Sequence, residues 1–329
     1  MRTTYPELLE RFTGILERRG MAPARARACS TLFADATRDG VATHGVNRFP
    51  VFVGQIDQGD VQVNAEPVLV SAWGAFERWD GQFGPGNLNA VRCMDRAIEL
   101  AREQGVGALA LRNTNHWMRA GSYGLQAAAA NCIGICWTNA LAAMPPWGGR
   151  DARLGTNPFV LALPGDPPVL VDLAMSQFSY GKLEEYRLKG ARLPVAGGYD
   201  GEGRLTDDPA AIEATRRMLP VGYWKGSALS MALDMIAAAL AGGHSVVDLS
   251  TKFRRETGVS QVFIAFAMDR LGPWEETVAR IKEDVRASLP AEPGAAVRIP
   301  GERSAAVRAA HDRDGILVDD RIWTRLENL

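Results

Sequence analysis

The order of apolar segments is the feature that most constrains how this sequence can fold. Strands are predicted at 68–72, 76–80, 106–111, 133–137, 159–163, 169–173 and 261–267. Helical patterns separate some neighbouring strands, and only a few residues separate others. Because strands and helices do not alternate as regular βαβ units, the sequence predicts a mixed α/β (α+β) architecture. A doubly wound parallel sheet is not expected.

The chain of 329 residues is long enough to form more than one lobe. Residues 1–66 are predicted to form a helical segment that packs with the C-terminal helices, at about 290–329. Residues 67–289 are predicted to form a mixed α/β core that binds cofactor and substrate. Within that core, helices are expected at 87–104, 122–130, 225–241 and 273–289.

Composition excludes several classes of function. The formal net charge is −1, and no Lys/Arg-rich run with interleaved aromatic residues indicates nucleic-acid binding. The longest apolar run, 231–241, is too short to span a bilayer and contains Asp234. The N-terminus begins with a helical pattern and shows no apolar signal segment, so a cytoplasmic location without membrane partners is expected. The spacing of the four cysteines fits neither a zinc site nor a disulfide framework: Cys29, Cys93, Cys132 and Cys136.

The common nucleotide and hydrolase motifs are absent from the sequence. No GxGxxG follows a predicted strand, and the run GQFGPGN has the wrong spacing for that fingerprint. A P-loop, a GxSxG elbow and an HExxH pair are also missing. A dinucleotide, if one is bound, is therefore held without the usual glycine motif, and metal-dependent hydrolysis is disfavoured.

Two short polar runs carry the candidate chemistry. His44 and Arg48 lie in ATHGVNRF, and His116 lies in NTNHWMRAG. Histidine can donate a proton to a ketone near neutral pH, and arginine can bind a carboxylate through two hydrogen bonds. If a helix begins near Gly45, Arg48 falls in its first turn, close to the loop that carries His44. The alternative is that each histidine is an ordinary satisfied residue and that Arg48 is a solvated helix residue.

A third candidate is Lys225 in GYWKGS, at the expected start of a helix. A lysine is electrostatically unfavourable at that position. This gives modest support for a phosphate or ribose partner.

With these residues identified, the chain resembles the type-2 malate/L-lactate dehydrogenase family of NAD(P)H-dependent oxidoreductases. The matching runs extend in order over essentially the whole sequence: ATHGVNRFP, NTNHWMRAGSYG, ICWTN, MPPWGG, LGTNPFVLALP, VDLAMS, YWKGS and IPGE. Within the family the pattern is most similar to the 2,3-diketo-L-gulonate reductases. The resemblance implies a non-Rossmann mixed-sheet NAD(P)-binding core and a homodimer whose active site is completed across the interface.

The resemblance also implies roles for individual residues. His44 would be the proton donor, Arg48 would bind the substrate carboxylate, and His116 would line the same pocket. The division of acid/base work between the two histidines is left open, and no metal is expected. Contacts to NADH, with NADPH as the alternative, would come from Pro168, Val169, Leu170, Val171, Asp172, Leu173, Ala174, Trp224, Lys225, Gly301, Glu302 and Arg303.

The expected reaction is reduction of a small 2-oxo acid, 2,3-diketo-L-gulonate to 3-dehydro-L-gulonate. Another 2-hydroxy acid of the malate, lactate or ureidoglycolate type is the first alternative, and a non-catalytic sugar-acid binding protein is the second. Two positions depart from the family pattern. Ala140 replaces a serine, and Glu302 and Arg303 stand in IPGER where PGHE is common.

Overall fold

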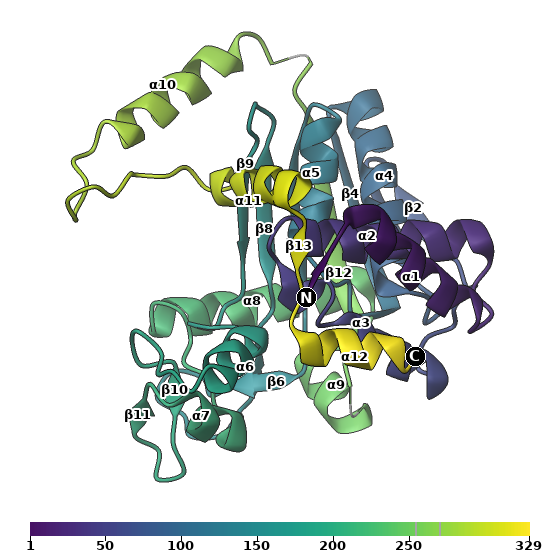
Figure 1. Ribbon diagram of the computed structural model, residues 1–329. Helices are drawn as coiled ribbons and strands as arrows, with labels where there is room; N and C mark the ends of the chain where they lie inside the picture. The colour runs from purple at the N-terminus through teal and green to yellow at the C-terminus, as the bar shows by residue number, and fades with distance from the viewer. Residues whose placement is uncertain (254, 270) are drawn as a thin grey trace.

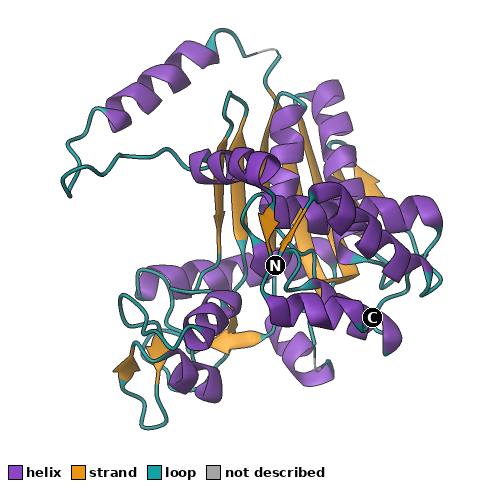
Figure 2. Ribbon diagram, in the orientation of Figure 1, coloured by secondary structure: helices purple, strands orange, loops and turns teal. Residues whose placement is uncertain are grey.

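A mixed sheet forms the centre of the computed structural model, which describes residues 1–253, 255–269 and 271–329 (Figures 1 and 2). Within these residues the sheet has seven strands in the order β2-β3-β4-β12-β5-β8-β9. Only the β3–β4 pair in it is parallel. The predicted mixed α/β fold is therefore confirmed. The strands are β2 (Val68–Trp73), β3 (Phe76–Asp80), β4 (Val106–Asn115), β5 (Cys132–Thr138), β8 (Phe159–Leu163), β9 (Val169–Leu173) and β12 (Thr257–Ala267).

Both faces of the sheet are covered, and the sequence of the central strand β12 shows why. Its successive side chains point to opposite faces, so Phe263 packs in the core beneath α4 (Gly86–Gln104) and α5 (Gly121–Ala129). Val262 packs in a second core beneath α8 (Trp224–Ala241). A strand buried on both faces reads as a nearly continuous apolar run, as β12 does.

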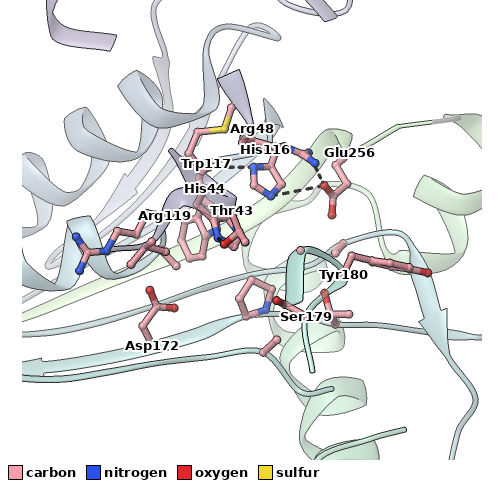
Figure 3. A pocket seen from close by; sticks show the side chains of 18 of the residues that line it. Thr43, His44, Arg48, His116, Trp117, Arg119, Asp172, Ser179, Tyr180 and Glu256 are labelled. Atoms are coloured by element: carbon pink, nitrogen blue, oxygen red, sulfur yellow. Dashed lines mark hydrogen bonds and ion pairs between the residues drawn. The ribbon is translucent and has the colours of Figure 1, made fainter. Parts of the chain in front are cut away.

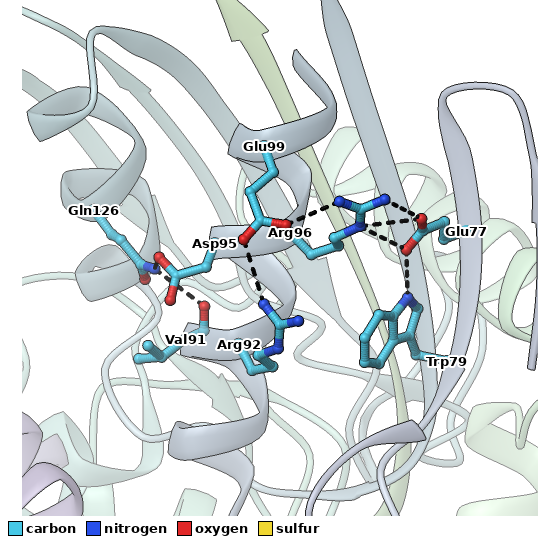
Figure 4. Close-up of polar contacts among 8 residues, drawn as sticks. All are labelled: Glu77, Trp79, Val91, Arg92, Asp95, Arg96, Glu99 and Gln126. Carbon is cyan, nitrogen blue, oxygen red and sulfur yellow. Dashed lines mark hydrogen bonds and ion pairs between the residues drawn. The ribbon is translucent and has the colours of Figure 1, made fainter. Parts of the chain in front are cut away.

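A buried ionic network fixes α4 to the edge of the sheet (Figure 4). The carboxylate of Glu77 accepts hydrogen bonds from Arg96 Nη2 and from Trp79 Nε1, both at 2.8 Å. Burial alone would raise the pKa of Glu77, but the hydrogen bonds from Arg96 and Trp79 lower it. At the first residue of α4, a Cβ on Gly86 would lie 2.0 Å from the carbonyl oxygen of Asn115. Glycine there lets the end of β4 pass directly over the helix start, which positions the loop that carries His116.

The N- and C-terminal segments pack together beside the sheet. β1 (Arg2–Thr3) pairs with β13 (Ile316–Leu317), and α12 (Asp320–Glu327) contributes to the same apolar cluster as α1 (Tyr5–Glu17), α2 (Pro23–Arg38) and α3 (Phe49–Asp57). Phe12 stacks on Phe49 at 4.0 Å between ring centroids. The division at residues 66 and 290 stays a prediction. The expected helix start near Gly45 is wrong, because α3 begins at Phe49 and Arg48 is its N-cap residue.

The remaining elements surround the sheet. The long 138–158 loop contains the hairpin of β6 (Ala142–Met144) and β7 (Leu154–Gly155). A small lobe holds α6 (Tyr180–Leu188), the hairpin β10 (Gly198–Tyr199) and β11 (Leu205–Thr206), and α7 (Pro209–Thr215). The other helices are α9 (Val246–Lys252), α10 (Trp274–Arg286) and α11 (Glu302–Asp314), of which α10 stands away from the body in Figure 1.

The described residues include neither a single helix that could span a membrane nor a cluster of metal-ligating side chains. No single helix there has the length and apolarity to cross a membrane, and α8 with α9 meets that test only as a pair bent by 80°. No group of three or more His, Cys, Asp or Glu side chains in the described ranges is arranged to hold a metal ion. All four cysteines are buried and unpaired.

Candidate active site

A cleft of about 780 Å³ lies between the N-terminal helices, the sheet and the small lobe. His44, Arg48 and His116 all line it, although 72 residues separate the two histidines in the chain (116 − 44). Figure 3 shows the three side chains converging on one side of the cavity, with Asp172 and Tyr180 across from them. The structure thus brings together the three residues that the sequence marked as catalytic candidates.

A tight turn after α2 places His44. The 3₁₀ turn η1 (Ala42–His44) ends at Gly45, where a Cβ would lie 2.2 Å from Thr37 Oγ1. That hydroxyl accepts a hydrogen bond from the backbone N–H of Val46 at 2.8 Å. Glycine is therefore required for the turn to pack against α2, and the contact holds the His44 ring at the cleft wall.

The two imidazoles have different hydrogen-bonding states. The backbone N–H of Met118 donates to His116 Nδ1 at 3.0 Å, so the ring proton of neutral His116 is on Nε2. That Nε2 lies 3.6 Å from Glu256 Oε2. His44 Nδ1 lies 3.2 Å from Thr43 Oγ1, and no described residue hydrogen bonds to its Nε2. Of the two histidines, His44 therefore retains a ring nitrogen without a protein partner.

Burial and neighbouring cations disfavour a second proton on either ring. The rings are nearly parallel, with centroids 5.9 Å apart. Burial, Arg48 and Arg119 lower the pKa of His44 to about 4. Burial, followed by Arg48 and His44, also holds the pKa of His116 well below its usual value. Both imidazoles are neutral at neutral pH when the cleft holds no anion.

Arg48 has a protein partner that the sequence did not reveal. Its Nη2 donates to Glu256 Oε2 at 3.0 Å, while its Nε is buried without a partner in the described residues. Glu256 lies just before β12, and its carbonyl oxygen accepts the N–H of His116 at 3.1 Å. In the sequence Glu256 is one acidic residue in RRETG, with no motif to distinguish it.

A buried carboxylate, that of Asp39, supports the cleft from behind. Asp39 is only 4% exposed and forms ion pairs with Arg119, which lines the cleft, and with Arg308 of α11. Its partners lie 80 and 269 residues away, so sequence patterns could not identify them. This network connects the end of α2, the His116 loop and α11.

The predicted cofactor residues divide into two groups. Four of them line the cleft: Leu170, Asp172, Ala174 and Gly301. The others do not line the cleft of the single chain: Pro168, Val169, Val171, Leu173, Trp224, Lys225, Glu302 and Arg303. Glu302 is occupied by an ion pair with Arg286 and by the N–H of Ile299 at 2.8 Å. Ser304, which the sequence did not indicate, lines the cleft one helical turn from Gly301.

The residues along β9 and α11 fit a dinucleotide. Gly301 has φ +104°, and a Cβ there would lie 2.6 Å from the carbonyl oxygen of Pro168. Only glycine allows α11 to begin this close to β9. The first N–H of the helix, that of Glu302, donates to the carbonyl oxygen of Ile299 at 3.2 Å. The following N–H groups of the first turn can bind a phosphate beside the cleft. The volume lies in the range of about 300–1,000 Å³ that is usual for ligand sites.

The outer part of the cleft comes from the small lobe, none of whose residues was among the predicted site residues. It is lined by three residues of α6, by one residue of α7 and by the C-cap residue of α7: Tyr180, Glu184, Arg187, Glu213 and Arg216. Ala140, which stands where the family pattern has a serine, lines the cleft. Its N–H donates to Asn157 Oδ1 at 3.0 Å.

Comparisons with known proteins agree with this geometry. The family model described as malate/L-lactate dehydrogenase matches residues 3–327. The chain belongs to this family. It is 48% identical to the 2,3-diketo-L-gulonate reductases of Klebsiella pneumoniae (strain 342) and Escherichia coli (strain K12 / DH10B), over 100% of each chain. The expected family and enzyme class, an oxidoreductase of the dehydrogenase type with a nicotinamide cofactor, are therefore confirmed.

Solved structures share the fold along the whole chain. A dehydrogenase from Sinorhizobium meliloti has a TM-score of 0.91 at 28% identity and covers 100% of this chain and 97% of its own. The sulfolactate dehydrogenase of Methanocaldococcus jannaschii has a TM-score of 0.90 at 28% identity, and the match covers 100% of this chain and 96% of that one.

Proposed function

We propose that this protein reduces the ketone of 2,3-diketo-L-gulonate to give 3-dehydro-L-gulonate, with NADH as the reductant and NADPH as the alternative. The relatives at 48% identity carry the name of that reaction. The observation that carries the proposal is the free Nε2 of His44 beside Arg48 in a cleft that fits a dinucleotide. A 2-oxo acid needs both groups: a proton donor for its carbonyl oxygen and a cation for its carboxylate.

We assign proton donation to His44 and a supporting role to His116. Both nitrogens of His116 face protein groups, since Nδ1 accepts from Met118 and Nε2 faces Glu256. Protonating a substrate from His116 would require breaking its contact with that carboxylate. His44 Nε2 has no such competitor among the described residues. A proton on this nitrogen can therefore pass to the substrate while Nδ1 keeps its contact with Thr43 Oγ1.

We assign the substrate carboxylate to Arg48. Its buried Nε has no partner in the described chain, and a buried donor without an acceptor is costly. A carboxylate placed against this guanidinium would satisfy Nε while Nη2 stays on Glu256. Its negative charge would also offset Arg48, whose proximity lowers the pKa of His44. Anion binding thus raises the pKa of His44 and prepares it to donate.

The coenzyme would lie along β9, held by Leu170, Asp172, Ala174, Gly301 and Ser304. When bound, the reduced nicotinamide supplies a hydride to the carbonyl carbon. The protein supplies the remaining proton, from His44 to the carbonyl oxygen, and the product is the alcohol. NADH and NADPH differ at the ribose 2′ position, so their relative KM values identify the preferred coenzyme.

We propose that the protein acts in the cytoplasm as a homodimer. The outer face of α8 exposes large apolar side chains, and the edge strand β2 does the same: Trp224, Leu229, Met231, Met235, Ile236, Val68, Leu69, Val70 and Trp73. Large apolar surfaces of this kind mark association sites. A dimer formed through α8 would also explain why Trp224 and Lys225 do not line their own cleft. Sedimentation analysis tests the dimer.

The test is coenzyme oxidation with a panel of 2-oxo acids, each assayed with NADH and with NADPH. The proposal predicts the highest kcat/KM for 2,3-diketo-L-gulonate. A higher kcat/KM for oxaloacetate, pyruvate or the ureidoglycolate couple would show that the protein acts on another 2-hydroxy acid couple. Binding of sugar acids without any coenzyme oxidation would make it a non-catalytic binding protein.

A further inference from the structure

The arginines around the cleft are nearly all neutralised by protein carboxylates. Three arginines of the cleft form ion pairs: Arg48 with Glu256, Arg119 with Asp39, and Arg187 with Glu213. Arg216 lines the outer cleft, and its guanidinium forms no ion pair with any described residue. The inner cleft therefore offers little positive charge beyond what one bound carboxylate requires.

Glu256 is an acidic residue of the cleft that contacts two of the three catalytic candidates. Its Oε2 lies 3.0 Å from Arg48 Nη2 and 3.6 Å from His116 Nε2, and its side chain is 26% exposed. Figure 3 shows its carboxylate at the same end of the cavity as these two groups. Tyr180, on the opposite wall, also faces this charge, which contributes to raising the pKa of the phenol after burial.

The backbone around Glu256 holds the carboxylate in place. The carbonyl oxygen of Glu256 accepts the N–H of His116 at 3.1 Å. The preceding residue, Arg255, donates through Nη1 to Asp60 Oδ2 at 2.8 Å. Both contacts connect this segment to separate elements and position the backbone of Glu256 beside Arg48 and His116.

We propose that Glu256 is a specificity-determining residue that makes the cleft select 2-oxo acids with one carboxylate and hydroxyl groups over 2-oxo acids with two carboxylates. This inference rests on the proposed function for the position of the first carboxylate, on Arg48. A second carboxylate would then enter a region with Glu256 as its neighbour, and like charges at about 4–6 Å repel strongly. Hydroxyl groups in that region donate hydrogen bonds to the same oxygens instead.

The proposal is tested with two substrates of nearly equal size. Oxaloacetate and 2-oxosuccinamate differ only in whether the second acyl group is a carboxylate or a neutral amide. The intact protein with its coenzyme is expected to have a higher kcat/KM for the amide. Glu256→Gln is expected to shift the ratio of the two kcat/KM values towards oxaloacetate by about tenfold, which corresponds to about 1.4 kcal/mol.

Two matched variants separate charge from structure. Glu256→Asp retains the negative charge and is expected to keep the preference for the amide. Glu66→Gln removes an exposed carboxylate outside the cleft, where Glu66 pairs with Arg25, and is expected to leave the ratio unchanged. If Glu256 only supports the local structure, Glu256→Gln lowers both kcat/KM values together and leaves their ratio unchanged, which overturns the proposal.

Calorimetric binding of the same two compounds to the protein–NADH complex makes the test independent of turnover. If the protein reduces no 2-oxo acid, the proposed function fails, but a binding preference for the amide that Glu256→Gln removes still supports this assignment. A wild-type protein without any preference for 2-oxosuccinamate, in binding and in turnover, contradicts the assignment even if the proposed reaction is confirmed.

Discussion

Proton uptake on binding an anionic ligand is the most informative prediction. His44 has a pKa of about 4 in the empty cleft, so roughly one molecule in a thousand carries the second imidazole proton at neutral pH. A carboxylate about 5 Å away, at an effective dielectric constant of about 20, stabilises that proton by about 3 kcal/mol. An energy of this size raises the pKa by about two.

The ligand for this experiment is oxamate, an unreactive analogue of a 2-oxo acid. Near pH 6, its binding to the protein–NADH complex is expected to take up about half a proton per site, a value that follows from the same shift. Calorimetry in buffers of different ionisation enthalpy measures this uptake directly. His44→Asn is expected to abolish it, and His244→Asn, the same change outside the cleft, is expected to retain it. Uptake that persists in His44→Asn would refute the assignment of the proton to His44.

Three further predictions concern stability and coenzyme binding. Because the folded-state pKa of His44 lies below the unfolded value of about 6.5, the unfolded chain gains the proton first as pH falls. The free energy of unfolding should thus decrease between about pH 6.5 and pH 4, by about 3 kcal/mol from this residue, and urea titrations of His44→Asn should show a smaller decrease. Asp39→Asn should lower the free energy of unfolding by about 3–5 kcal/mol, because it leaves Arg119 buried without its charge partner, whereas a loss below about 1 kcal/mol in urea would contradict the buried network. Gly301→Ala should weaken NADH binding at least about tenfold in fluorescence titrations, because a φ of +104° and the close contact with Pro168 both disfavour a side chain. Equal affinity for NADH would show that α11 does not contribute to the coenzyme site.

The sheet could be predicted from the sequence because its strands are short apolar runs bounded by turn residues. The periodic helices were predicted for the same reason, and α4 and α8 lie close to the expected ranges. The start of α3 was misplaced, although Pro50 is a local signal for a first helical turn. That helix begins four residues later than expected, so Arg48 precedes it as the N-cap residue.

The candidate site was only partly accessible to sequence reasoning. His44, Arg48 and His116 lie in unusual polar runs, and the resemblance identified them. Glu256 and Asp39 lie in ordinary sequence, and their partners are far away in the chain, so only the folded structure shows their contacts. The same holds for the outer cleft, whose residues come from a small lobe to which the sequence assigned no site residue.

The central claim is that His44 donates the proton while hydride arrives at the same carbonyl. The most direct measurement is the single-turnover rate of NADH oxidation with 2,3-diketo-L-gulonate, in wild-type protein and in His44→Asn, together with the Kd for NADH. Loss of a positioned general acid is expected to lower the rate about 10²- to 10⁴-fold while the Kd changes little. A His44→Asn protein that oxidises NADH at the wild-type rate would contradict the account.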